Sequence, residues 1–294
     1  MPVILDTSRR RHELLSLWIE AGFLVKLALV LALVLALGAV FAPLIAPFDP
    51  AAQSLLSRLR PPFGFERAVS GHLLGTDELG RDMLSRSLHG LQLTLGLAVL
   101  GATIGLLIGG SIGLIAGIVG GRTENLLMAA VDVQISVPFT LIALFVLAVF
   151  GSSLPVMVLV LGLYGWEQYA RIVRAEVRRL MALPFIEAAR LAGSRPFRLA
   201  REHLLPNIIS PLVVQFTLSL SSIILQESTL SFLGLGVQPP TATLGSMVGV
   251  GRDFLPTAPW IVLAPALLIL LTTFVVQILG DWLRDQTDVR LRGR

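Results

Sequence analysis

Long apolar runs dominate the pattern along this chain, and polar residues collect between them. A membrane-spanning helix needs about 20 mostly apolar residues, and six stretches approach or exceed that length. These predicted spans cover residues 23–47, 93–119, 127–150, 154–172, 208–235 and 259–279. The fourth is the least regular, because Trp166, Glu167 and Gln168 interrupt it. The pattern therefore predicts an all-α, polytopic membrane protein with about six transmembrane helices.

Composition supports a membrane protein. Of the 294 residues, 54% are hydrophobic and only 14% are charged, whereas soluble domains carry about 25% charged residues. The chain has no cysteine, which excludes disulfides and thiolate metal sites. The four histidines show no metal-ligand spacing, so we expect no metal site.

Arginines lie mainly in the segments between the apolar runs and at the two ends of the chain. Cytoplasmic segments carry the excess of arginine and lysine in membrane proteins. The longest basic segment lies between the fourth and fifth predicted spans, and its arginines are Arg171, Arg174, Arg178, Arg179, Arg190, Arg195, Arg198 and Arg201. Arginines also precede the first span and follow the sixth. We therefore expect this segment and both termini to be cytoplasmic, and we take the net charge of +4 as a topology signal rather than a sign of nucleic-acid binding.

Four regions follow from this topology. Residues 1–22 are the expected cytoplasmic N-terminus, residues 23–92 an anchor helix with an extracytoplasmic connection, residues 93–280 the transmembrane domain, and residues 281–294 a cytoplasmic tail. The first apolar run exceeds the 7–15 residues of a signal-peptide core, so we expect it to remain as an anchor. The stretch "GRDMLSRSLHG" before the second span predicts an interfacial helix.

A glycine recurs at every fourth position along the second predicted span. The series is Gly101, Gly105, Gly109, Gly113, Gly117 and Gly121. Four residues advance a helix by about 400°, so these glycines form one slowly turning stripe. Small residues at this spacing let helices pack closely in a bilayer. The stripe indicates tight packing, or alternatively a surface along which the helix slides during a transport cycle.

A few polar side chains lie inside the predicted spans, where they are costly and usually face a cavity or the bundle interior. Asp132 lies at the expected interface, and Glu167 has Arg171 four residues away as a structural partner. Glu227 has no basic neighbour on its own helix, so it is either part of a polar pathway or a buried, hydrogen-bonded acid. Gln226 and Gln215 join it as candidate pathway residues.

The segment "PFIEAARLAGSRPFRLAREHLLPN", residues 184–207, is amphipathic and predicts two short helices. Residues 185–192 form the first, Gly193 ends it, Ser194 caps the second, and Pro206 marks the break before the fifth span. The first helix exposes Glu187, Ala188 and Ala189 in succession. From the residues alone this is either a docking surface or an interfacial helix that turns the chain around.

A family resemblance bears on that choice. "EAARLAG", followed by "HLLPN", closely resembles the signature of importer-type ABC permeases, in which this segment is the coupling helix that docks into the ATPase subunit. "LLGTDELGRDMLSRSLHG", "STLSFLGLGVQPP" and "GDWLRD" resemble the second permease of the oligopeptide, dipeptide and nickel importers. Two positions depart from the family pattern, Leu244 for the usual tryptophan and Val289 for the usual proline.

The resemblance implies a type I importer permease fold with segment 184–206 as the coupling segment. It also implies a homologous permease partner in a heterodimer, two ABC ATPases, an extracytoplasmic substrate-binding protein and a bacterial inner membrane. The only lysine, Lys26, lies in the first apolar run, so the chain has no phosphate-loop pattern. ATP and magnesium are therefore expected on partner chains, with no cofactor and no catalytic residue here.

The substrate class stays open at this point. Di- and oligopeptides are the default that the resemblance gives, and nickel, glutathione and opines are alternatives. A secondary transporter using Glu227 for ion coupling is a second class of function, although no inverted repeat supports it. An intramembrane enzyme is a third, but the sequence lacks a His-Glu-x-x-His pattern, cysteine, and a serine–histidine pair within the spans.

Overall fold

The computed structural model describes residues 22–287, and across that range the chain is helical with no β-strand. The helices are α2 Phe23–Val40, α3 Ala42–Ile45, α4 Met83–Val119, α5 Gly121–Ser136, α6 Phe139–Phe150, α7 Leu154–Gly162, α8 Trp166–Met181, α9 Pro184–Leu191, α10 Pro196–Leu199, α11 Leu205–Leu230, α12 Leu244–Gly251 and α13 Trp260–Thr287. The all-α prediction is confirmed. The expected N-terminal region and most of the expected C-terminal tail lie outside the described residues.

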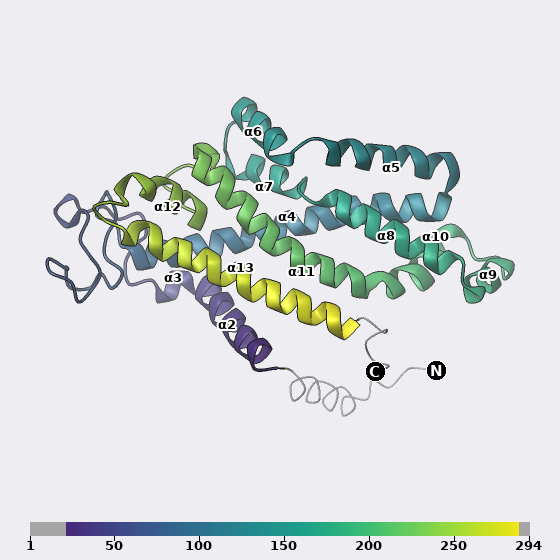
Figure 1. Ribbon diagram of the computed structural model, residues 1–294, viewed down its shortest axis with the longest axis horizontal. Coiled ribbons are helices and arrows are strands. Elements are labelled where there is room, and N and C mark those ends of the chain that lie inside the picture. The colour runs from purple at the N-terminus through teal and green to yellow at the C-terminus, as the bar shows by residue number, and fades with distance from the viewer. Residues whose placement is uncertain (1–21, 288–294) are drawn as a thin grey trace.

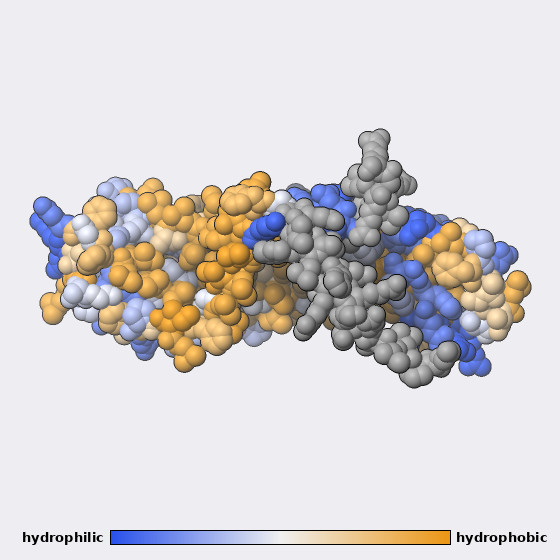
Figure 2. All heavy atoms as spheres, turned by 90° about the horizontal axis from the view of Figure 1, so that it is seen from below, coloured by the Kyte–Doolittle hydropathy of each residue, from blue (hydrophilic) through white to orange (hydrophobic). Residues whose placement is uncertain are grey.

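Four helical stretches of the described chain are long and apolar enough to cross a membrane. They are Phe23–Val40, Met83–Val119, Pro196–Leu235 and Trp260–Gln286. The pair α5–α6 passes the same test only when it is counted as one bent span, with 82° between its halves. Figure 2 shows a broad hydrophobic zone crossing the molecule between more hydrophilic ends. The polytopic architecture is confirmed, while the six continuous spans expected from hydropathy become four, with a fifth that is bent.

The fourth predicted span, residues 154–172, is not one helix. α7 ends at Gly162 and α8 begins at Trp166, and Gly165 between them has a left-handed φ of 80°. α8 then carries a buried apolar face and an arginine face along its whole length. Hydropathy merged the end of α7 with the apolar face of an amphipathic helix, which explains the error.

The third predicted span, residues 127–150, bends between α5 and α6. Val137 has an extended backbone, with φ −102° and ψ 126°, and Pro138 follows it. A residue before proline is disfavoured in the helical region, and proline has no backbone N–H to donate. The break therefore has a local sequence cause.

The second predicted span begins earlier than expected. Asp82 caps α4 by accepting a hydrogen bond of 2.7 Å from the backbone N–H of Ser85, which satisfies a free donor of the first turn. Met83 and Ser85 are fully buried. "GRDMLSRSLHG" is thus the buried start of α4 and not a separate interfacial helix.

Pro206 does not break the chain before the fifth span. A π-helical turn, η2 Ala200–Leu204, joins α10 to α11, and the backbone N–H of Leu205 bonds to the carbonyl of Ala200. This wider turn admits the proline, because neighbouring backbone groups shift register around its missing donor. The helix is continuous from Pro196 to Leu235.

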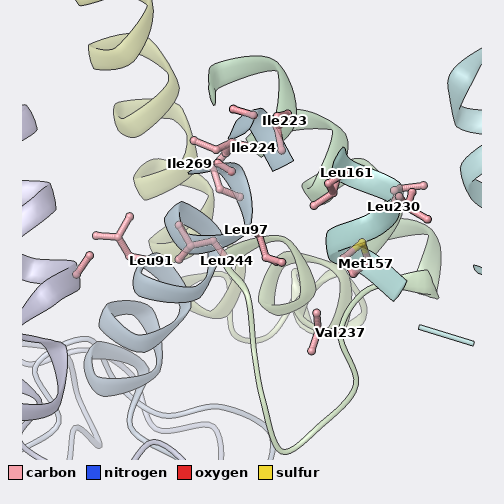
Figure 3. Packing of buried hydrophobic residues seen from close by; sticks show 14 of the residues in the cluster. Leu91, Leu97, Met157, Leu161, Ile223, Ile224, Leu230, Val237, Leu244 and Ile269 are labelled. Carbon is pink, nitrogen blue, oxygen red and sulfur yellow. The ribbon is translucent and has the colours of Figure 1, made fainter. Parts of the chain in front are cut away.

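The main hydrophobic core joins α4, α7, α11 and α13. Figure 3 shows Leu91 and Leu97 of α4, Leu161 of α7, Ile224 of α11 and Ile269 of α13 converging on it. α4 runs along the long axis of the molecule beside α8, its most extensive neighbour. α9 lies at one end of that axis, and the connection 46–82 lies at the other (Figure 1). The fold therefore separates two polar ends by an apolar bundle.

Candidate coupling and translocation site

The amphipathic segment forms α9, a glycine turn and α10. Gly193 has φ 82°, and its N–H bonds to the carbonyl of Arg190 at 2.9 Å, while the N–H of Ser194 bonds to the carbonyl of Ala189 at 3.1 Å. This pair of bonds is a Schellman motif, which ends a helix on a left-handed glycine. Gly193 therefore lies where a helix-ending glycine is expected.

The predicted capping role of Ser194 is wrong. The N-cap of α10 is Arg195, which makes no side-chain capping bond, and Pro196 occupies the first turn. The backbone N–H of Ser194 is already used to close the end of α9. Ser194 belongs to the end of the first helix rather than the start of the second.

α9 presents a mixed surface to the outside. Ile186 is its one buried residue, whereas Glu187 and Ala188 are exposed and Ala189 is half-buried. Leu191 is 85% exposed, and Phe197 of α10 is 78% exposed. Two large apolar side chains at a polar end, close to an exposed glutamate, are typical of a surface that another protein covers.

A second hydrophobic cluster anchors α9 from beneath. Ile186 packs with Val177 and Leu180 of α8 and with Leu204 and Ile208, which precede and begin the α11 stretch. Only Ala182 and Leu183 separate α8 from α9. α9 is therefore packed directly against α8 and the start of α11. Pro206 is exposed beside this cluster.

The two candidate glutamines lie on α11 and contact other helices. The side-chain nitrogen of Gln215 donates to the side-chain oxygen of Gln168 on α8 at 2.8 Å, and it lies 3.3 Å from the hydroxyl of Ser219. Gln226 lies 3.4 Å from the hydroxyl of Thr140 on α6. Gln215 is buried and Gln226 is half-buried in this chain.

Glu227, on α11, is buried against the first residues of α12. Its Oε1 accepts hydrogen bonds of 2.6 Å from Ser231 and 2.7 Å from Thr243, the N-cap residue of α12. Its Oε2 has no hydrogen-bond partner and faces Gly245, where any side chain would collide with Ser228. Glu227 is 1% exposed, so in this conformation it has the surroundings of a buried, hydrogen-bonded acid. Gln226 is the more open of the two neighbours.

The glycine stripe of α4 faces α7 and α8. A Cβ added to Gly101 would lie 3.2 Å from Leu161, one on Gly109 would lie 2.8 Å from the Cβ of Tyr169, and one on Gly117 would lie 2.6 Å from Val177. Gly105 faces the carbonyls of Gly162 and Tyr164, and Gly113 faces Ala170 and Val173. Gly121 is different, because it starts α5 and has open space around it.

One expected ion pair is replaced by another, and Glu124 forms ion pairs that were not expected. Arg171 contacts Asp132 of α5 at 2.7 Å, not Glu167, whose Oε2 is buried without a hydrogen-bond partner. Glu124, at the start of α5, contacts Arg174 and Arg178 of α8. Glu124 was not among the residues predicted from the sequence, where the available signal was an acid next to the end of a glycine stripe.

The connection before α4 holds a buried ionic network that sequence reasoning also missed. Asp77 contacts Arg81 at 2.6 Å and Arg86 at 3.2 Å, and Glu78 contacts Arg81 at 2.6 Å. Asp77, Arg81 and Arg86 are less than a tenth exposed. The indole N–H of Trp260 donates to the carbonyl of Thr76 at 3.0 Å, which fixes this network to α13. The three acids and one arginine of "TDELGRD" were the available signal.

A cavity of about 610 Å³ opens beside this network, at the end of the molecule opposite α9. Glu78, Arg81 and Arg86 line it from one side, and Phe232 and Arg252 line it from the segment around α12. The cavity thus lies between two stretches that are far apart in sequence, at the end of the bundle where α4 begins.

Comparisons with known proteins bear on this arrangement. A family model described as "Binding-protein-dependent transport system inner membrane component" matches residues 109–289. The di/tripeptide transport system permease protein DppC of Pseudomonas aeruginosa is 41% identical over 255 residues, which cover 87% of this chain and 84% of that protein. The oligopeptide transport system permease protein OppC of Bacillus subtilis is 33% identical over 293 residues, covering 98% and 94%.

Solved structures also resemble the fold. A chain of the inward-facing MetNI methionine ABC transporter superposes with a TM-score of 0.52 at 21% identity, and the match covers 70% of this chain and 98% of that one. At this identity the likeness concerns the fold. The matched family region includes α9, the glycine turn and all of α11.

Proposed function

We propose that this chain, which belongs to the family of binding-protein-dependent transport system inner membrane components, contributes half of a peptide-conducting pathway and receives the force for transport through α9. It is a multi-pass permease subunit of an ABC importer. Di- and oligopeptides are the proposed substrates, because the relatives named above transport di-, tri- and oligopeptides.

The single observation that carries the coupling role is the surface of α9. An exposed Glu187, the small exposed Ala188 and the 85% exposed Leu191 lie at the basic end of the molecule, over a buried anchor at Ile186. A protein cleft lined by apolar side chains and an arginine fits this surface, because it would cover the leucine and pair with the carboxylate. We propose that the ATPase supplies this cleft.

The proposed assembly contains a homologous second permease, two ATPases that bind ATP and magnesium, and an extracytoplasmic binding protein. The arginines of α8, α9 and α10 lie at the α9 end, which supports a cytoplasmic location for that end. The opposite end, with its cavity of about 610 Å³, would then face outward and receive substrate from the binding protein. Both termini are proposed to be cytoplasmic.

The transport cycle that we propose is a two-state change. Closure of the ATPase pair on ATP draws the coupling helices of the two permeases together, and the bundle opens to the outside. Hydrolysis resets it. A partner can shift this equilibrium only by the difference in its affinity for the two states, so α9 must be held differently by the ATPase before and after closure.

The test is co-purification of the tagged chain, expressed with its neighbouring genes, in mild detergent. The wild-type chain is expected to retain ATPases in stoichiometric amount, and Glu187→Arg is expected to lose them while remaining in the membrane. Asp253→Arg is the matched control, because its carboxylate is also exposed but lines the cavity at the other end of the molecule. Retention of ATPases by Glu187→Arg, or peptide uptake by the purified chain without ATP, would overturn the proposal.

A further inference from the structure

Glu124 is a buried acid at the start of α5, held by two arginines of α8. Its Oε1 accepts a hydrogen bond of 2.6 Å from Nε of Arg174 and forms an ion pair with Nη2 of the same arginine at 2.6 Å, and its Oε2 lies 3.2 Å from Arg178. The Glu124 side chain is only 5% exposed, while the arginines are about half exposed. Removing one partner of such a pair leaves the other charge poorly compensated, which is costly when it is buried.

α8 contacts α4 and α5 through different faces. Tyr169, Val173 and Val177 pack against the glycine stripe of α4. Arg171, Arg174 and Arg178 project from another face, and all three contact acids of α5. The ion pairs form two steps of a ladder, with Glu124 at one step and Asp132 at the other. α8 is thus packed to α4 by apolar contact and joined to α5 by charge.

α5 has little else to hold it within this chain. Glu124 and Val131 are its only buried residues. On one side it meets α4 at Gly120 and Gly121, which both have positive φ, so the connection to α4 is a glycine joint. On the other side it bends by 82° into α6, which contacts α11 through Thr140 and Gln226.

α8 leads directly into α9, with two residues between them. A movement of α9 therefore displaces α8, and the Glu124 pair lies on α8 within about two turns of that junction. Because Glu124 also lies next to the glycine joint, it can transmit a displacement of α8 to α5 without the help of α4. The alternative link is the Asp132–Arg171 pair, which is more than half exposed on both sides and correspondingly weak.

We propose that Glu124 is the positioning residue that fixes the start of α5 to α8, so that displacement of the coupling helix α9 is passed to the bent pair α5–α6. This inference rests on the proposed function, since it assumes that α9 receives the movement of the ATPase. In this proposal, α5 moves because Glu124 ties its first turn to α8. The ladder makes Glu124 the principal contact and Asp132 an auxiliary one.

The first experiment compares Glu124→Gln with Glu176→Gln in proteoliposomes containing the whole transporter. Glu176 is the matched control, because it pairs with Arg179 within α8 at 2.8 Å and does not join two helices. Peptide uptake per ATP hydrolysed is expected to fall about fivefold or more in Glu124→Gln, the lower end of typical coupling between sites. The control is expected to match the wild type. Equal stoichiometry of uptake in both variants would overturn the proposal.

A charge exchange separates positioning from mere stability. Glu124→Arg and Arg174→Glu are each expected to uncouple uptake from hydrolysis, and the double variant Glu124→Arg/Arg174→Glu is expected to recover part of the coupling. A purely structural role predicts that uptake follows the melting temperature of the complex across these variants. Uptake per ATP that simply tracks the melting temperature across all three variants would therefore count against the proposal.

The absence of native cysteine allows a direct measurement of the α5–α8 distance. Spin labels at Asn125→Cys and Ala175→Cys, both at exposed positions, report the separation of the two helices in the assembled transporter. A narrow distribution that keeps its width with and without ATP is expected, and Glu124→Gln is expected to broaden it. An unchanged distribution in Glu124→Gln would refute the positioning role. If the wild-type chain failed to retain ATPases, the proposed function itself would fail, independently of these results.

Discussion

Replacing Gly109 by alanine tests whether the glycine stripe of α4 sets the distance to α8. The added Cβ would lie 2.8 Å from the Cβ of Tyr169, and it would overlap the carbonyl oxygen of Trp166. Two carbon atoms pack best at about 3.5–4.0 Å. The contact with Tyr169 alone therefore requires α8 to retreat by about 0.7 Å, and α8 is a stiff helix that cannot yield at one residue.

The steric cost of the added methyl group is partly offset by the higher helix propensity of alanine. A radial gap of about 0.5–1 Å removes roughly a quarter to a half of the attraction at each affected contact, and overpacking of this kind costs about 1–3 kcal/mol. Alanine recovers about 1 kcal/mol over glycine in a helix interior. Gly110 points away from α8, and a Cβ added there would meet only the tip of a flexible leucine side chain at 3.9 Å. Gly110→Ala therefore gains helix propensity without overpacking. Both substitutions gain the same alanine preference, so they should differ in stability by the overpacking cost alone, about 1–3 kcal/mol.

Thermal unfolding of the purified chain in one detergent measures this difference. The expected order of melting temperature is Gly110→Ala at or above the wild type, then Gly101→Ala, then Gly109→Ala. Gly101 is intermediate because its added Cβ would lie 3.2 Å from Leu161. Equal melting temperatures for Gly109→Ala and Gly110→Ala would refute the packing argument. A Gly109→Ala chain that melts normally but transports slowly would instead support the sliding interpretation of the stripe.

Three further substitutions are predicted from single contacts, each measured by thermal unfolding in detergent. Asp77→Asn should lower the free energy of unfolding by about 3–5 kcal/mol, because two buried arginines lose their shared carboxylate. Asp253→Asn, which changes an exposed ion pair, should unfold like the wild type. Glu227→Leu should lower the free energy of unfolding by about 1–3 kcal/mol for each buried hydroxyl left without an acceptor. Glu227→Gln should lower it less, because glutamine retains one acceptor oxygen. Loss of uptake by Glu227→Gln at normal stability would place this residue on the pathway. Gly193→Val should shorten or unwind the end of α9 at a cost of about 1–2 kcal/mol, while Gly193→Asn should be tolerated better, since asparagine adopts the left-handed conformation more readily.

Features that depend on neighbours in the sequence were predicted well. The helix end at Gly193 follows from a glycine after an amphipathic octamer, and the structure places a left-handed residue there. The outlines of α2, α11 and α13 follow from apolar runs long enough to span a bilayer. Each of these depends on local propensity and length, which single-chain periodicity records directly.

Features that depend on contacts between distant segments were missed or misassigned. Arg171 was expected to pair with Glu167 on its own helix, but Asp132 of α5 takes it. Glu124 lies 50 residues from Arg174, and no pattern along the chain joins them. Hydropathy also averaged across Val137–Pro138 and Gly165, where the backbone breaks two of the predicted spans. A hydropathy average depends only on how many apolar residues a segment contains, so it does not register that a residue before a proline is disfavoured in a helix.

The contacts of α8 limit where this subunit can deform. Its apolar face is interlocked with the glycines of α4, and its arginines join it to α5, so α8 transmits displacement to both neighbours as a rigid body. Large changes in dihedral angle are absorbed by a few residues at the ends of elements. The described chain offers such residues at Val137–Pro138, between α5 and α6, and near Gly165, between α7 and α8. A change of state that moves α9 relative to α6 has these two joints available, and by our proposal it reaches the first of them through Glu124.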